Sequence, residues 1–125
     1  MAKKKILIVD DEVGFTRVVK LNLDATGKYD VMVENKGAEA LDAVQSFKPD
    51  LIFLDIIMPD VEGSEVARQI KADPKLKDIP IVFLTATVTR QEVGAGRGLI
   101  GGLAFLAKPV HVQDLVNCIE QYTRE

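Results

Sequence analysis

Four short apolar runs constrain the fold of this chain more than any other feature of its sequence. They are Ile6–Val9, Leu51–Leu54, Ile81–Leu84 and Leu103–Leu106, and a weaker run lies at Val31–Val33. Most of these runs do not alternate apolar with polar residues, which is typical of strands covered on both faces. Strands of that kind form parallel sheets, so we expect helices between them.

Apolar stripes with the 3.6-residue period of amphipathic helices lie between the runs. They consist of Phe15, Val18, Val19 and Leu23; Ala40, Leu41, Val44 and Phe47; Val66, Ala67 and Ile70; and Val112, Leu115, Val116, Ile119 and Tyr122. The connection from Thr89 to Gly102 differs because glycines crowd its second half. Each glycine inside a helix costs about 1 kcal/mol relative to alanine, so a helix there should be short or labile.

This alternation predicts an α/β fold, a (βα)5 doubly wound five-stranded parallel sheet with right-handed crossovers. The length of 125 residues corresponds to one domain, so we expect residues 1–125 to form it, with no further domain visible. We take the strand order 2-1-3-4-5 from flavodoxin-like folds and not from the sequence.

Composition disfavours several classes of function. A net charge of −3 provides no positive field for nucleic acid. No apolar stretch approaches the roughly 20 residues of a membrane-spanning helix, so we expect no membrane association. The single cysteine, Cys118, can form neither an intramolecular disulfide nor a thiolate metal cage, which fits a cytoplasmic location.

Polar residues stand where the predicted strands end, and parallel sheets bind ligands outside the carboxyl ends of their strands. The strand ends carry Asp10 and Asp11, Asp55, Thr85, and Lys108-Pro109. The strand at 31–33 differs, because the residues that follow it, Glu34 and Asn35, match none of these. In the order 2-1-3-4-5 this strand lies at the edge and the other four lie side by side, so the aspartates should converge.

Three converging carboxylates require a cation, since at about 4 Å each pair repels by ~1 kcal/mol in water and ~4 kcal/mol at an intermediate dielectric. Oxygen ligands suit Mg²⁺, and the absence of nearby Cys and His disfavours zinc. Lys108 and Thr85 offer a positive charge and a hydroxyl donor for a phosphoryl group. Asp55, the single central acid, is the best candidate for a nucleophile.

Each of these residues alone has an ordinary structural interpretation. Asp11 and Glu12 at the start of a helix are typical capping residues, Lys108 is a solvated charge, and Thr85 is a strand residue. Their common location at the strand ends of one predicted fold favours a functional site over these separate explanations.

Over essentially the whole chain, these motifs resemble the receiver domain of bacterial two-component response regulators, which has the chemotaxis-regulator-like fold. The resemblance rests on four segments, which are Val9-Asp10-Asp11-Glu12, Asp55-Ile56-Ile57-Met58-Pro59 with Gly63, Leu84-Thr85-Ala86 and Lys108-Pro109. Such a protein is a phosphorylation-dependent switch and not an enzyme, because it catalyses only its own phosphorylation and dephosphorylation.

The resemblance also implies roles for individual residues. Asp55 would accept a phosphoryl group from the phosphohistidine of a sensor histidine kinase or a phosphotransfer protein. Mg²⁺ would be held by Asp11, Asp55 and the backbone carbonyl of Ile57, with Asp10 acting through a metal-bound water. Thr85 and Lys108 would bind the phosphoryl oxygens, and the Lys108-Pro109 peptide should be cis.

Phosphorylation would then draw Thr85 inward and let Phe105 rotate toward the vacated space. The face formed by the fourth helix, fifth strand and fifth helix would change its affinity for a downstream protein, or for a second copy in a phosphorylation-dependent homodimer. Several positions depart from the common pattern, including the pair Leu103-Ala104 before Phe105 and the glycine cluster Gly94–Gly102. Ile57 and Thr87 occupy places that modulate acyl-phosphate hydrolysis, and we expect Leu103 to contribute to a partner contact.

Two other classes compete with this interpretation. A Mg²⁺-dependent phosphohydrolase of the haloacid dehalogenase type also uses an aspartyl nucleophile, but its motif requires Asp-x-Asp, whereas Asp10 and Asp11 are adjacent. A flavodoxin-like electron carrier requires a phosphate loop rich in Ser and Thr after the first strand, and this chain has none.

Overall fold

The computed structural model describes residues 3–86, 99–100 and 103–123. Its elements in chain order are β1 (Lys4–Val9), α1 (Val13–Ala25), β2 (Tyr29–Glu34), the 3-10 helix η1 (Gly37–Glu39), α2 (Ala40–Phe47), β3 (Leu51–Asp55), α3 (Gly63–Ala72), β4 (Ile81–Thr85), β5 (Leu99–Ile100), β6 (Leu103–Ala107) and α5 (Val112–Tyr122). All five predicted strands and the four helical stripes are therefore present as strands and helices.

The predicted strand order is confirmed, with β6 in the place of the fifth strand. Parallel pairing connects β2, β1, β3, β4 and β6 in that order. One difference is β5, which pairs antiparallel with the outer edge of β6 where the sequence pattern suggested the end of a helix. Glycine-rich sequence weakens a helix, and the open edge of β6 offers Leu99–Ile100 the hydrogen bonds of a strand instead. The rest of the expected helix, 89–98, lies outside the described residues.

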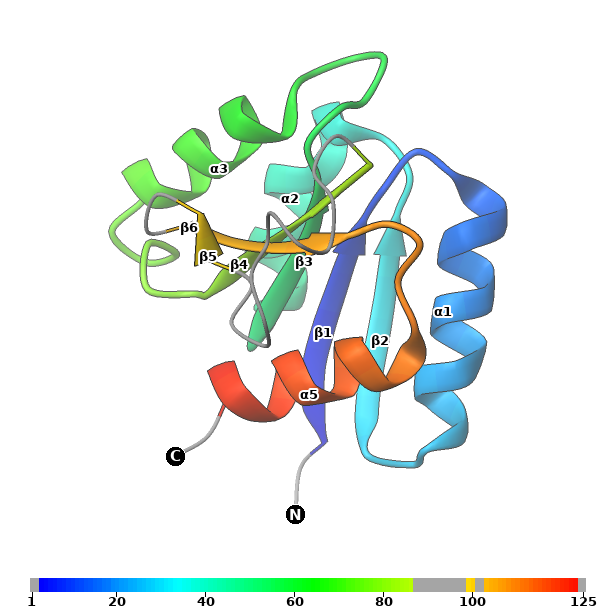
Figure 1. Cartoon of the computed structure of the whole chain (residues 1–125). Coiled ribbons are helices and arrows are strands. Elements are labelled where there is room, and N and C mark those ends of the chain that lie inside the picture. The colour runs from blue at the N-terminus through cyan, green and yellow to red at the C-terminus, as the bar shows by residue number, and fades with distance from the viewer. Residues whose placement is uncertain (1–2, 87–98, 101–102, 124–125) are drawn as a thin grey trace.

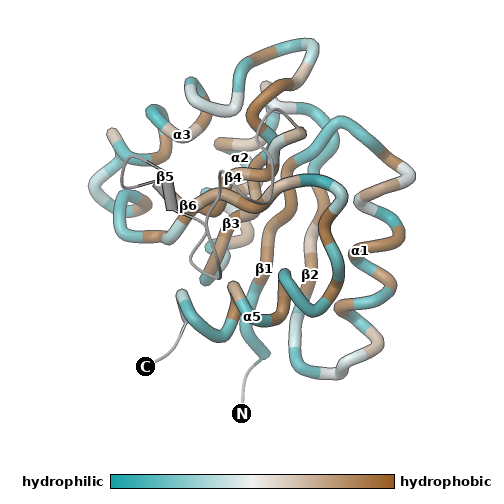
Figure 2. The backbone as a smooth tube through the Cα atoms, viewed as in Figure 1, coloured by the Kyte–Doolittle hydropathy of each residue, from teal (hydrophilic) through white to brown (hydrophobic). Residues whose placement is uncertain are grey.

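The sheet separates two apolar layers, because successive residues of a strand point to opposite faces. Ile6 and Ile8 of β1 pack with residues of α1 and α5, whereas Leu7 and Val9 pack with residues of α2 and α3. Figure 1 shows these helix pairs on the two faces, and Figure 2 shows the hydrophobic strands between them. The interpretation of strands covered on both faces is confirmed.

The buried face of α1 differs in one position from the predicted stripe. Val19 and Leu23 are buried as expected, but Val18 is 56% exposed, so its assignment to the buried face is wrong. The buried position one turn before Val19 belongs to Thr16, a polar residue that hydropathy alone does not select.

In the part of the chain that the structure describes, no helix is long and apolar enough to cross a bilayer.

Gly63 fixes how closely α3 approaches the end of β3. Its backbone N–H donates to the Ile56 carbonyl oxygen at 2.7 Å, and a Cβ there would lie 2.9 Å from the Ile56 Cα and collide with the Asp55 carbonyl oxygen. Only a residue without a side chain permits this contact. The first turn of α3 is thereby held directly against the backbone of Asp55.

We therefore expect Gly63→Ala to lower the free energy of unfolding by about 2 kcal/mol, because the backbone around Asp55 must shift. Gly14→Ala is the matched control. A Cβ at Gly14 meets nothing within 4 Å, so alanine should stabilise α1 by about 0.5 kcal/mol. Chemical denaturation measures both, and equal effects of the two substitutions would contradict the argument.

Candidate functional site

Three aspartates meet at the carboxyl ends of β1 and β3. Carboxylate oxygens of Asp10, Asp11 and Asp55 all lie within 4.8 Å of one another. Asp10 is fully buried, and Asp55 is 6% exposed. Backbone hydrogen bonds hold both strand ends, since the N–H of Asp10 donates to the Glu34 carbonyl oxygen and that of Ile56 donates to the Leu84 carbonyl oxygen. The expected convergence of the aspartates is therefore present.

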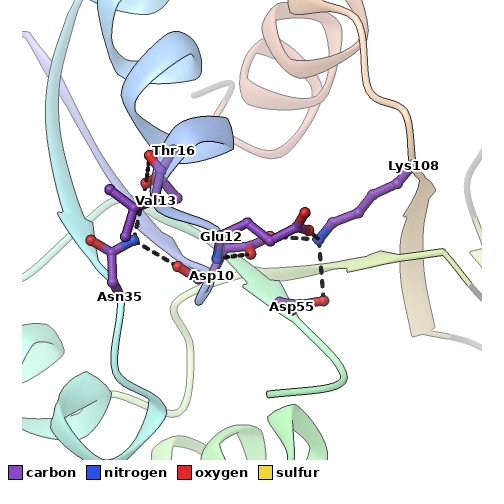
Figure 3. Close-up of polar contacts among 7 residues, drawn as sticks. All are labelled: Asp10, Glu12, Val13, Thr16, Asn35, Asp55 and Lys108. Atoms are coloured by element: carbon purple, nitrogen blue, oxygen red, sulfur yellow. Dashed lines mark hydrogen bonds and ion pairs between the residues drawn. The ribbon is translucent and has the colours of Figure 1, made fainter. Parts of the chain in front are cut away.

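Lys108 brings the balancing positive charge into this cluster (Figure 3). Its Nζ lies 2.8 Å from Asp10 Oδ2, 2.7 Å from Glu12 Oε1 and 3.5 Å from Asp55 Oδ1. The ammonium also lies 5.1 Å from the centre of the Phe15 ring, within cation–π range. The Lys108-Pro109 peptide is cis, as the sequence resemblance implies.

Burial and mutual repulsion dominate the protonation of the cluster. Burial, followed by the charge of Asp10, raises the pKa of Asp55 to about 6. Burial also raises the pKa of Asp10, despite its hydrogen bonds from Lys108 and the backbone of Glu12. Burial lowers the pKa of the Lys108 ammonium, but its hydrogen bonds to Asp10 and Glu12 outweigh this effect, so the pKa is raised. The carboxylates are thus short of positive charge even with Lys108 in place.

A pocket of about 280 Å³ opens onto this cluster, and it is lined by Asp11, Glu12, Asp55, Ile57, Thr85, Ala86 and Lys108. Thr85 is buried at the end of β4, and its carbonyl oxygen accepts a hydrogen bond from the Lys108 N–H at 2.8 Å. Ile57 is 64% exposed at the pocket. The pocket therefore brings Asp55, Thr85 and Lys108 together, as the pattern of strand ends predicts.

Phe105 does not line this pocket. It lies on β6 and stacks on Phe83 of β4, with ring centroids 5.4 Å apart and planes 29° apart. The contact places Phe105 on the face of the sheet that carries α2 and α3. Thr87 lies outside the described residues, and so does the side chain of Leu103.

The donor set fits Mg²⁺. All three clustered ligands are carboxylate oxygens, and among the described residues no cysteine or histidine belongs to such a cluster. Mg²⁺ prefers oxygen ligands and retains several waters, for which the adjoining pocket leaves room. The net deficit of positive charge described above favours a divalent cation, and zinc sites usually include the nitrogen or sulfur ligands that this cluster lacks.

Sequence reasoning missed two polar residues. Asn35, set aside because its strand end matched no other, hydrogen-bonds to the backbone of Asp10 and to Thr16. Glu12, interpreted as a capping residue, makes no capping hydrogen bond with its side chain and instead pairs with Lys108, 96 residues later. Asn35 could have been identified by its position, because it directly follows the edge strand as the other polar site residues stand at the ends of their strands.

The raised pKa of Asp55 makes stability depend on pH in a definite direction. The pKa is about 6 in the folded state and 3.8 for the free side chain, so the folded state binds the proton more tightly. Stability is then highest below pH ~4 for this group and is lost as the pH rises through 6.

In chelator at pH 7.5 we expect Asp55→Asn to be more stable than the unchanged protein by about 2 kcal/mol, and the difference to vanish near pH 4. Denaturant unfolding at both pH values measures this. Asp30→Asn, at the opposite end of the sheet, is the charge-matched control. A destabilising effect of Asp55→Asn at pH 7.5 would show that repulsion does not dominate the cluster.

Comparison with known proteins places this site in a family. The model of the response regulator receiver domain matches residues 6–120. The polar-differentiation response regulator DivK of Brucella anthropi is 32% identical over 120 residues, 95% of each chain. The alkaline phosphatase synthesis transcriptional regulatory protein PhoP of Bacillus subtilis is 42% identical over 107 residues, which are 85% of this chain and 42% of PhoP.

Among solved structures, the chemotaxis protein CheY4 of Vibrio cholerae has a TM-score of 0.81 at 28% identity, with 97% of this chain and 99% of CheY4 covered. The agreement extends over nearly the whole length of both chains. This chain therefore belongs to the response regulator receiver domain family, whose members are signalling switches of two-component systems.

Proposed function

We propose that this protein is a signalling switch that accepts a phosphoryl group on Asp55 from the phosphohistidine of a sensor histidine kinase or a phosphotransfer protein. One observation carries the proposal. The Asp55 carboxylate lies at an open pocket within reach of Asp10, Asp11 and the Lys108 ammonium. No other described cluster of acidic residues has this geometry.

The phosphoryl transfer forms one bond and breaks one. A carboxylate oxygen of Asp55 bonds to phosphorus while the bond from phosphorus to the donor imidazole nitrogen breaks, and that nitrogen keeps the electron pair. Lys108 neutralises charge on the phosphoryl oxygens, which requires only a small shift because its Nζ already lies 3.5 Å from Asp55 Oδ1. The hydroxyl of Thr85, which also lines the pocket, donates to another phosphoryl oxygen.

Asp11, Asp55 and the backbone carbonyl of Ile57 are the residues that would hold Mg²⁺, with Asp10 acting through a water. When bound, the ion supplies positive charge against the phosphoryl oxygens. Asp10 is suited to the indirect role because its carboxylate is already engaged by Lys108 and by the Glu12 N–H.

Signalling would follow from movement of Thr85 and Phe105. Phosphorylation draws the Thr85 hydroxyl toward Asp55, and Phe105, three residues before Lys108, rotates away from its stack on Phe83. The face around β6 and α5 then changes its affinity for a downstream protein or for a second copy of the chain. Leu103 of β6 is our proposed contact residue on that face.

The central test is phosphorylation by a small donor. In acetyl phosphate and Mg²⁺ we expect mass spectrometry to detect one added phosphoryl group, which is lost in chelator and in Asp55→Asn. Asp30→Asn should be phosphorylated like the unchanged protein. No adduct with Mg²⁺ present, or steady turnover of a small phosphate ester as in a phosphohydrolase, would overturn the proposal.

Ile57 should prolong the phosphorylated state. Its exposed side chain lines the pocket beside Asp55 and hinders the attack of water on phosphorus. We expect Ile57→Asn to shorten the lifetime of the phosphorylated protein severalfold in a decay assay. Leu21→Asn replaces an equally exposed residue on α1 and should leave the lifetime unchanged. A lifetime that is unchanged or longer in Ile57→Asn contradicts the shielding role.

A further inference from the structure

Asn35, the first residue after β2, reaches across to the loop that follows β1 (Figure 3). Its side-chain nitrogen Nδ2 donates two hydrogen bonds, to the Asp10 carbonyl oxygen at 2.8 Å and to Thr16 Oγ1 at 3.0 Å. Both contacts join residues far apart in the sequence. Asn35 therefore connects the edge strand to the segment that carries two of the three clustered aspartates.

The directions of the hydrogen bonds in this network require a donor nitrogen in the side chain at position 35. The Thr16 hydroxyl donates its own hydrogen to the Val13 carbonyl oxygen at 3.1 Å, so its oxygen can only accept from Asn35. The Asp10 carbonyl oxygen is also an acceptor. A single atom with two hydrogens satisfies both, and the asparagine side chain supplies such an atom whereas an aspartate carboxylate does not.

The network holds the backbone on both sides of Asp11. Asn35 binds Asp10 directly and binds Val13 through Thr16, which is 1% exposed. Within the loop, the Glu12 N–H donates to Asp10 Oδ1 at 2.9 Å. Asp11 stands between these two anchored points, so Asn35 restricts where its carboxylate can lie.

We propose that Asn35 is a positioning residue for the magnesium site: it holds the loop after β1 so that Asp10 and Asp11 face Asp55 before the ion arrives. The inference rests on the proposed function, because it assumes that these aspartates hold Mg²⁺. Groups that orient metal ligands without touching the metal commonly alter metal affinity about 10-fold when they are removed.

Calorimetric Mg²⁺ titration of the folded protein tests this. We expect Asn35→Ala to raise the Kd for Mg²⁺ about 10-fold, and Asn22→Ala, the same truncation on the exposed side of α1, to leave it unchanged. Asn35→Asp sharpens the test. Its added negative charge, next to Asp10, would by itself tighten Mg²⁺ binding, whereas lost positioning weakens it. Asn22→Asp, near the far end of α1, should leave the affinity unchanged.

Thr16 provides a second, independent pair of variants. Thr16→Val keeps the shape but removes the oxygen that accepts from Asn35, so Mg²⁺ affinity should fall, while Thr16→Ser keeps the hydroxyl and should preserve it. Amide hydrogen exchange adds a readout without metal, since the Glu12 amide should exchange faster in Asn35→Ala than in Asn22→Ala.

The outcomes separate this inference from the proposed function. If the unchanged protein fails to bind Mg²⁺, the proposed function fails. If it binds and Asn35→Ala binds equally well, only the positioning role fails, even where Asn35→Ala unfolds more readily. Tighter binding by Asn35→Asp would likewise overturn the positioning role.

Discussion

The site is organised by the mutual repulsion of three carboxylates and its incomplete relief by one ammonium. Asp10 and Asp55 are both largely buried, so each loses hydration as well as facing a like charge. Lys108 contacts both of them, yet the pKa of Asp55 stays raised. The remaining deficit favours whatever brings further positive charge, and this makes the pocket receptive to a divalent cation.

Holding such a cluster together requires a rigid frame, which the parallel sheet and its loops provide. Two contacts hold the backbone at Asp55. The N–H of the next residue, Ile56, donates to the Leu84 carbonyl oxygen, and the first turn of α3 packs against Asp55 at Gly63. The backbone of Asp10 is held by Glu34 and Asn35 at the neighbouring strand. The packing of the two apolar layers therefore keeps the carboxylates close together, although their ionisation lowers the stability of the folded protein.

Much of this was predictable because it depends on local pattern. Uniformly apolar runs identified the buried strands, and polar residues directly after them identified Asp10, Asp55 and Lys108. Val18 was assigned to the wrong face because hydropathy favours it over Thr16, whose buried hydroxyl is satisfied by the Val13 carbonyl oxygen and by Asn35. The strand β5 was not predicted, because the glycine-rich connection was interpreted as a weak helix, although the antiparallel partner Leu103 lies only three residues after Ile100.

The sequence alone determined which chemistry is available, because the carboxylates, the threonine and the lysine stand at the ends of the strands. In a parallel sheet these ends all lie at the same edge. Tertiary structure alone decided which polar groups pair. Glu12 with Lys108, and Asn35 with Asp10 and Thr16, are contacts between distant segments. Hydrogen bonds act over about 3 Å, so no local pattern records a partner that the fold brings from far along the chain.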